Sequence, residues 1–341
     1  MTMLRIGSMI VPSWQSTKDS CVRLLRPAIV GASVILIMMS GHGAWSQTRT
    51  IKIVVPSPPG GGPEMLVRVL ADQIRQTQAL TMVFENRPGA ATIIGTEAVA
   101  RATPDGNTLL ATTTGFVVNP HLRKSNYDPL NSFEPICELA SIPQVIAVNS
   151  ASPYRTLVEL LSAARAKPGE LTMASIGPAS ANHIGFEKFK RAANINMTFV
   201  PYPSSTPAVT ALLGEQVTSM VGDSAVIAEQ VKAGKLRALA IASRARIALL
   251  PEVPTVAEAG YRDFELDIWS GLFAPAKTPK QTVSQLAGWF TAALQTPMAK
   301  AKLEIQGYTS NGVCGADFAT SLSKQYNDYG RIIREANIKV E

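Results

Sequence analysis

The chain has 341 residues, of which 46% are hydrophobic and 17% charged, and its formal net charge is +7. This composition excludes a disordered chain, because disordered chains combine few apolar residues with a high fraction of charge. With 24 Gly and 3 Cys, a collagen-like repeat and a disulfide scaffold are also excluded. At roughly 100 to 200 residues per domain, the length favours two globular domains.

Residues 1–46 have the three-part layout of an export signal. Basic residues come first, and the apolar run that follows, 28–39, is much shorter than the roughly 20 residues of a membrane-spanning helix. Ala44-Trp45-Ser46 then gives the small-x-small sequence that signal peptidase cleaves. An uncleaved membrane anchor is the alternative. We expect a cleaved signal and an exported, soluble mature protein.

The charge that remains after cleavage is a mild, scattered positive excess. It attracts small anions, but it lacks the concentrated basic face that nucleic acid requires, so no nucleic-acid partner is expected. Cys137 and Cys314 remain in the mature chain. They could pair in an oxidising compartment, but sequence alone does not bring their Cα atoms within bonding reach. Two buried free thiols are therefore the favoured interpretation.

Short β-type runs alternate with longer segments of helical period, which is typical of parallel strands joined by crossover helices. The pattern predicts an α/β fold. The expected strands are 51–55, 82–85, 108–112, 145–148, 171–175, 198–200, 217–221 and 238–242. The expected helices are 65–74, 94–101, 156–166, 182–193, 207–213 and 225–233.

Two loops between a strand and a helix carry the functional prediction. The loop 56–64 contains three successive glycines, and these leave backbone N–H groups uncovered at a helix start, where anions bind readily. The loop 175–183 repeats this arrangement in the second half of the chain, with Ser180 as a candidate N-cap. The carboxyl ends of strands in open α/β sheets leave a crevice for ligand, so the loops predict a cleft for a small anion.

Structural roles alone would also explain these residues. A Gly/Pro-rich loop is usually a connection, Ser180 can be only a cap, and His183 only a packing residue. Glu64 gains from the helix dipole without any ligand. The occurrence of two such loops in equivalent positions favours binding.

Enzyme signatures are mostly missing from the sequence. It contains no phosphate loop, no H-E-x-x-H and no C-x-x-C, and Ser180 does not lie in a G-x-S-x-G elbow. No cofactor and no metal site are therefore expected. A secreted hydrolase that uses Ser180 and His183 is the rival from another class.

Several stretches occur in a characteristic order along 52–334: Pro59-Gly60-Gly61, Glu85-Asn86-Arg87-Pro88-Gly89-Ala90, Pro104-Asp105-Gly106, Phe133-Glu134-Pro135, Val200-Pro201-Tyr202, Leu250-Pro251-Glu252-Val253-Pro254 and Trp269-Ser270-Gly271. In this order they resemble the periplasmic solute receptors of the tripartite tricarboxylate transporters, often called the Bug family. The resemblance implies a type II periplasmic-binding-protein fold, a two-lobed Venus flytrap with a ligand cleft between the lobes. It places residues 47–148 and 270–341 in lobe 1 and residues 149–269 in lobe 2.

The resemblance also implies a function. It predicts an extracytoplasmic protein, without enzymatic activity, that captures a di- or tricarboxylate or a related organic acid. Its expected partners are this ligand and the membrane subunits of a tripartite tricarboxylate transporter, and we expect a monomer in the periplasm. An orphan receptor that feeds a sensor is the remaining alternative. Carried over residue by residue, the ligand contacts are Gly60, Gly61, Glu64, Thr113, Thr114, Gly177, Ser180, His183 and Asp223.

This sequence departs from the family pattern at the acid of the first loop, which is usually Asp. The extra methylene of Glu64 is expected to push its carboxylate further into the cleft. A negative group beside a carboxylate ligand repels it unless water lies between them.

Overall fold

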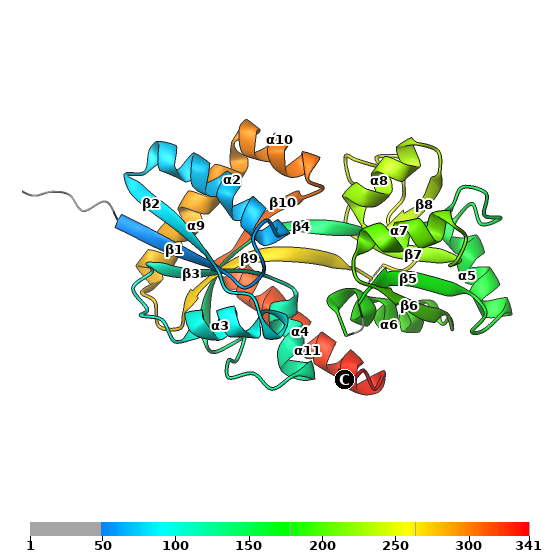
Figure 1. Cartoon of the computed structure of the whole chain (residues 1–341), viewed down its shortest axis with the longest axis horizontal. Coiled ribbons are helices and arrows are strands. Elements are labelled where there is room, and N and C mark those ends of the chain that lie inside the picture. The colour runs from blue at the N-terminus through cyan, green and yellow to red at the C-terminus, as the bar shows by residue number, and fades with distance from the viewer. Residues whose placement is uncertain (1–48, 178, 263, 341) are drawn as a thin grey trace, which may run out of the picture. The chain divides into compact units, whose positions relative to one another are not determined.

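The computed structural model describes residues 49–177, 179–262 and 264–340 (Figure 1). The export signal predicted at 1–46 lies outside the described residues. Of the helices within these three ranges, none combines the length and the hydropathy needed to cross a bilayer.

In the described residues, ten strands are connected by pairing. Their order is β2-β1-β3-β9-β4-β7-β5-β6, and both β8 and β10 also pair with β4. The strands are β1 (Arg49–Val55), β2 (Leu80–Asn86), β3 (Thr108–Thr113), β4 (Phe133–Asn149), β5 (Thr172–Ile176), β6 (Thr198–Tyr202), β7 (Ser219–Asp223), β8 (Leu236–Ile241), β9 (Asp267–Pro275) and β10 (Thr309–Cys314).

Helices follow most of the strands. A short 3₁₀ turn, η1 (Ala90–Thr92), comes directly before the second helix, α3 (Ile93–Ala100). The helices are α2 (Gly62–Thr77), α3 (Ile93–Ala100), α4 (Gly115–Leu122), α5 (Leu157–Ala166), α6 (Ala181–Ala193), α7 (Ser205–Leu213), α8 (Ser224–Lys232), α9 (Lys280–Gln295), α10 (Pro297–Ile305) and α11 (Gly315–Glu335).

The strands fall into two groups that share β4. The first strand group is β1, β2, β3, β9 and β10, and the second is β5, β6, β7 and β8. Residues 133–143 of β4 pair with β9 in the first group, and residues 144–149 pair with β7 and β8 in the second. Figure 1 shows β4 running through both groups.

Each group contains three strands that run parallel and lead into helices. The first group has β1, β2 and β3, which are followed by α2, α3 and α4, and the second has β5, β6 and β7, which are followed by α6, α7 and α8. Because parallel strands point the same way, the helix starts of each group gather at one edge of its strands. Both predicted ligand loops lie at such edges.

Side chains alternate between two cores in both groups, as a strand period of two requires. In β1, Ile53 packs with α2 and α9, while the next residue, Val54, packs in a separate aromatic cluster around Phe116 and Phe273. Burial of each such Ile or Val side chain stabilises the fold by about 1.5–3 kcal/mol. The helices therefore cover both faces of the first strand group. In the second group, the neighbouring residues Val145 and Ile146 of β4 also belong to different hydrophobic clusters, so helices cover both faces there as well.

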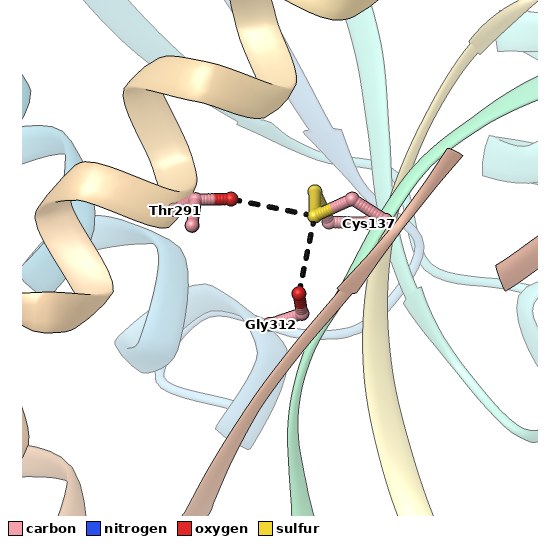
Figure 2. The surroundings of a disulfide bond; sticks show 4 residues. Cys137, Thr291 and Gly312 are labelled. Atoms are coloured by element: carbon pink, nitrogen blue, oxygen red, sulfur yellow. Dashed lines mark hydrogen bonds between the residues drawn. A yellow bond between two sulfur atoms is a disulfide. The ribbon is translucent and has the colours of Figure 1, made fainter. Parts of the chain in front are cut away.

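A disulfide joins Cys137 of β4 to Cys314 of β10 (Figure 2). The expectation of two free thiols is wrong. The two residues are directly opposite in the antiparallel β4–β10 register, with their Cα atoms 4.0 Å apart, although 177 positions separate them in the sequence. The hydroxyl of Thr291 on α9 lies 3.4 Å from the Cys314 Sγ.

The α/β fold class is confirmed. All strands and helices expected between residues 51 and 242 are present, although the strand expected at 145–148 is only the last part of the much longer β4. The pattern led to no assignment for α4, β9, β10 and the three C-terminal helices.

Candidate functional site

The first ligand loop joins β1 to α2, and its own acid occupies part of it. The Glu64 carboxylate is 3% exposed and accepts hydrogen bonds from the Gly60 N–H (3.0 Å), the Asn86 Nδ2 (2.8 Å) and the Arg68 Nε (2.7 Å). Burial raises the pKa of Glu64, but the hydrogen bonds from Asn86, Arg68 and Gly60 outweigh burial and hold the pKa below its ordinary value. The carboxylate therefore turns back onto its own loop instead of extending outward.

This arrangement changes the electrostatics expected for the loop. The Arg68 guanidinium pairs with Glu64 at 2.6 Å and lies over the ring of Phe84, 4.2 Å from its centroid. The negative charge of Glu64 is thus balanced within the loop, and its repulsion of a carboxylate ligand is reduced. The N-cap residue of α2, Gly61, gives the helix no side-chain cap. The positive end of α2 is therefore available to an anion.

The hydroxyl of Tyr308, which immediately precedes β10, lies beside the first loop. A Cβ placed on Gly62 would stand 2.5 Å from that oxygen, so only glycine fits there without a shift. Tyr308 is buried, and burial together with the charge of Asp223 raises its pKa to about 12, while the Ser270 side chain acts in the opposite direction. The phenol therefore stays protonated and can act as a hydrogen-bond donor.

Three successive threonines lie where β3 ends and α4 begins, and they differ in their contacts. The Thr114 hydroxyl is buried and accepts a hydrogen bond from the Trp269 N–H (3.2 Å), which ties the end of β3 to β9. Thr113 is half-buried and pairs with Ser270. The Thr112 Oγ1 is buried without a hydrogen-bond partner among the described residues. Thr114 thus has a structural partner, whereas Thr113 has no side-chain bond recorded in the described part of the chain.

The second ligand loop is held together by its own side chains. Ser180 is the N-cap of α6: its Oγ accepts from the His183 N–H (3.2 Å) and lies 2.6 Å from the Ile176 carbonyl oxygen. The His183 Nδ1 accepts from the Ala179 N–H (3.1 Å). The prediction that Ser180 caps this helix is confirmed, and Gly177, with φ +38°, allows the sharp turn that precedes it.

His183 also packs against the second strand group. Its ring stacks on Phe199 with centroids 4.1 Å apart. Burial lowers the pKa of His183, and the charge of Lys190 adds to this effect, while Glu187 opposes it. A neutral ring is consistent with Nδ1 accepting a hydrogen bond.

Asp223 belongs to a buried polar network that the sequence did not indicate. Its carboxylate accepts from the Gln144 Nε2 (2.9 Å) and from the Ser205 Oγ (2.9 Å). The Gln144 Oε1 in turn accepts from the Asn182 Nδ2 (2.7 Å). The first turns of α6 and α7, the N-cap of α8 and strand β4 are thereby joined, and the negative charge of Asp223 lies near positive helix ends.

The two strand groups are in contact at Gly307, the residue before Tyr308. The Ser224 Oγ donates to the Gly307 carbonyl oxygen (3.4 Å), and a Cβ on Gly307 would lie 2.7 Å from that of Ala225. No hydrogen bond of the described residues joins 60–64 directly to 175–183. Tyr308, Gln144, Asn182 and Ser205 are additions to the predicted set, and no sequence motif marked them.

The chemistry of this set is that of hydrogen bonding. Hydroxyls, amides and helix starts gather at the carboxyl ends of parallel strands, where ligands bind in open α/β folds. Within residues 49–177, 179–262 and 264–340, no group of three or more His, Cys, Asp or Glu side chains is placed to hold a metal ion.

The fold, two strand groups that share one long strand, is similar to that of a solved periplasmic binding protein, BugD, with a TM-score of 0.67 and 31% identity over 86% of this chain and 99% of that one. Residues 66–338 match the family described as "Tripartite tricarboxylate transporter family receptor". The chain belongs to this family, whose receptors are periplasmic solute-binding proteins and not enzymes. The family resemblance seen in the sequence is confirmed.

Known proteins are similar to this chain in sequence and in fold along most of its length. The "UPF0065 protein in tcbD-tcbE intergenic region" of Pseudomonas sp. (strain P51) is 35% identical over 290 residues, which is 84% of this chain and 86% of the relative. The solved structure of Rpa4515 of R. palustris with adipate is similar with a TM-score of 0.70 and 29% identity, covering 86% of this chain and 99% of that one. MatC of Rhodopseudomonas palustris with bound malate gives a TM-score of 0.66 and 26% identity, covering 84% and 99%.

Proposed function

We propose that this chain captures a small organic carboxylate, a di- or tricarboxylate or a related acid, and delivers it to the membrane subunits of a tripartite tricarboxylate transporter. The observation that carries the proposal is the helix start at Gly61, which has no side-chain cap and whose neighbouring acid, Glu64, is balanced by Arg68. Acids of this class are present in two of the similar structures, with adipate and with malate.

The proposed ligand site combines residues of both strand groups. Gly61, Thr113 and Tyr308 would present donors from the first group. The loop at Gly177 and the helix start at Asp223 would face them from the second. Glu64, Ser180 and Asp223 would act mainly by shaping the loops, because their side-chain oxygens already have partners within the chain. The His183 Nδ1 is taken by the Ala179 N–H in the same way. The full proposed set is Gly60, Gly61, Glu64, Thr113, Thr114, Gly177, Ser180, His183 and Asp223, extended by Tyr308.

The proposed mechanism is capture by closure. Residues 47–148 and 270–341 would form one lobe and residues 149–269 the other, with the acid bound between them. Closure excludes water from the bound acid, and each donor contact becomes stronger in the lower dielectric. No covalent bond is made or broken.

We further propose that the receptor works as a monomer in the periplasm after cleavage of residues 1–46. Delivery to a permease and delivery to a sensor would use the same captured complex. The family assignment favours the permease, because the family is defined by tripartite transporters.

The rival hydrolase is disfavoured by the geometry of Ser180 and His183. A nucleophilic serine needs its hydroxyl hydrogen-bonded to the base, but the Ser180 Oγ contacts the backbone of its own turn. The His183 Nδ1 is taken by the Ala179 N–H. Both side chains therefore serve the turn in which they lie.

Mass spectrometry of the ligand released from freshly purified mature protein tests the proposal. We expect an organic acid, and titration calorimetry of the emptied protein with malate, adipate and citrate should give one binding site for at least one of them. Release of neutral compounds alone, with no heat from any of the three acids, would overturn the carboxylate assignment.

Tyr308→Phe tests the position of the site, with Tyr154→Phe as the matched control. Tyr308→Phe removes a buried donor beside Gly62 and should weaken acid binding about tenfold, as the loss of one hydrogen bond to a charged group implies. Tyr154 lies before α5 in the second strand group, and its variant should bind as the wild type does. Equal affinities of both variants would remove Tyr308 from the site.

A further inference from the structure

A cavity of about 610 Å³ is lined by residues of the chain segment that connects β8 to β9, and this segment contains none of the proposed ligand residues. Three arginines line it, Arg244, Arg246 and Arg262, and Glu258 is the only carboxylate among the lining residues that the structure describes. The side chains around the cavity therefore carry a net positive charge. The arginines contribute guanidinium groups, which recognise carboxylates and phosphates through paired N–H donors.

The backbone that carries these arginines is held firmly to the second strand group. Strand β8 bonds to the loop before Glu258, because the Ile241 N–H donates to the Pro254 carbonyl and the Val256 N–H donates to the Ile241 carbonyl, each at 2.8 Å. The Leu266 N–H donates to the Ala242 carbonyl at 2.7 Å. The walls of the cavity are thus tied to one another and to a strand.

Arg246 is fixed in place by a carboxylate that is itself fixed. The Arg246 Nε lies 3.0 and 3.2 Å from the two oxygens of Glu258. Glu258 and Thr255 cap each other: the Thr255 N–H donates to the Glu258 Oε2 (2.7 Å), and the Glu258 N–H donates to the Thr255 Oγ1 (3.1 Å). The side chain of Arg246 therefore loses little further freedom when it binds an anion.

Arg244 has one carboxylate partner but an exposed side chain, and Arg262 has no recorded partner among residues 49–177, 179–262 and 264–340. The Arg244 Nε donates to the Glu265 Oε1 at 2.8 Å, and its two terminal nitrogens have no recorded partner in the described part of the chain. Arg262 is exposed and takes part in no recorded hydrogen bond or ion pair of the described residues. Several guanidinium N–H donors around one cavity thus remain for a ligand.

We propose that this cavity is a second binding site, which takes a small polyvalent oxyanion of the phosphate or polycarboxylate class. Arg246 supplies fixed donors and Arg244 supplies exposed ones. Arg262 adds a charge that no carboxylate of the described residues offsets. The cavity is open to solvent, so its affinity falls as salt concentration rises.

Calorimetric titration of the mature protein with inorganic pyrophosphate, and separately with citrate, tests this site at low ionic strength. The variant Arg244→Gln/Arg262→Gln should bind pyrophosphate at least tenfold more weakly than the wild type. The control Lys124→Gln/Arg155→Gln removes the same charge from two exposed side chains outside the cavity, and it should keep the wild-type affinity.

Titration with citrate distinguishes the arginine-lined cavity from the carboxylate site of the proposed function. If citrate binds at both places, two binding events are expected in the wild type, and Arg244→Gln/Arg262→Gln should remove one of them. The Tyr308→Phe variant should keep its pyrophosphate affinity whether or not the chain binds malate. Equal pyrophosphate affinity of the wild type and Arg244→Gln/Arg262→Gln, or an equal loss in the charge control, would overturn the proposal.

Discussion

Gly62 and Tyr308 lie so close that the hydroxyl of the tyrosine occupies the place of a Gly62 side chain. A Cβ at Gly62 would stand 2.5 Å from the phenol oxygen and 3.7 Å from the ring carbon that carries it. The start of α2 and the residue before β10 are thus matched in shape, although the chain separates them by most of its length.

Gly62→Ala should destabilise the protein by about 1–3 kcal/mol, because the new methyl group overpacks against the Tyr308 hydroxyl. Gly62→Ala/Tyr308→Phe should recover most of this loss, since removal of the oxygen leaves an ordinary 3.7 Å contact. Urea unfolding of the double-mutant cycle measures the coupling. Gly288→Ala, in open space on α9, is the control and should stabilise the fold by about 0.5–1 kcal/mol. Additive effects of the two changes at 62 and 308 would contradict the contact.

Loss of the disulfide should lower the free energy of unfolding by about 2–5 kcal/mol, because the bond closes a long loop in the unfolded chain. Cys137→Ala/Cys314→Ala tests this without burying a new hydroxyl. Its unfolding midpoint in urea should fall below that of the wild type and should not respond to a reducing agent. A reducing agent should lower the wild-type midpoint to a similar value. If the urea unfolding curves of the oxidised wild type and the variant coincide, the disulfide is absent in solution.

The stability of the protein should fall as pH rises through neutrality, because of Asp267. Burial raises the pKa of this carboxyl from 3.8 to about 7, the charges of Glu265 and Glu138 add to the increase, and Arg244 opposes it. Between these two pKa values the folded state holds a proton that the unfolded state has released, so the free energy of unfolding decreases with pH. Above the pKa that Asp267 has in the folded state, this contribution to stability is fully lost, and the free energy of unfolding no longer changes with pH because of Asp267.

Melting temperatures at about pH 5 and about pH 8 measure this effect. Asp267→Asn keeps the shape of the side chain and cannot ionise, so the difference between the two temperatures should shrink. Asp317→Asn, at an exposed position in the first turn of α11, should leave the difference as in the wild type. The same pH dependence in Asp267→Asn and the wild type would show that another group causes it.

Asn182→Ala should cost about 1–3 kcal/mol, because it leaves the buried Gln144 Oε1 without its donor. Gln144→Ala removes the acceptor together with a donor to Asp223. The double variant should be less destabilised than the sum of the two, by about 0.5–3 kcal/mol, because the residues share one network. Guanidinium unfolding of the four proteins measures this coupling, and strict additivity would argue that the two side chains act separately.

Features that depend on local sequence could be predicted. The Ser180 cap follows from a short polar residue before a helical run, and the compact β-branched run in residues 51–55 marks a buried strand, because neighbouring positions decide both. The C-terminal third was harder to assign. Strand β9 contains a central glycine, and β10 has no fully buried residue and is rich in polar residues, so neither shows a clear alternation.

Features that depend on distant pairing could not be predicted. The sequence marks Glu64 as an acid at a helix start, but its bonds to Gly60 and Asn86 require the loop and β2 to be placed together. The disulfide depends on the β4–β10 register, and the prediction of free thiols was wrong for that reason. Tyr308 comes to lie beside Gly62 of the first ligand loop only through the packing of the last third of the chain. Family resemblance supplied the candidate residues, whereas their contacts came from the three-dimensional arrangement.

Strand β4 changes its pairing partners at a proline. Pro143 is opposite Asp267 in the β4–β9 ladder, and Gln144, the next residue, pairs with β7. Proline has no N–H to donate, so the ladder loses a rung where the strand passes from one set of neighbours to the other. Resistance of β4 to bending should therefore be reduced at this junction, so that the two strand groups can turn slightly relative to one another there.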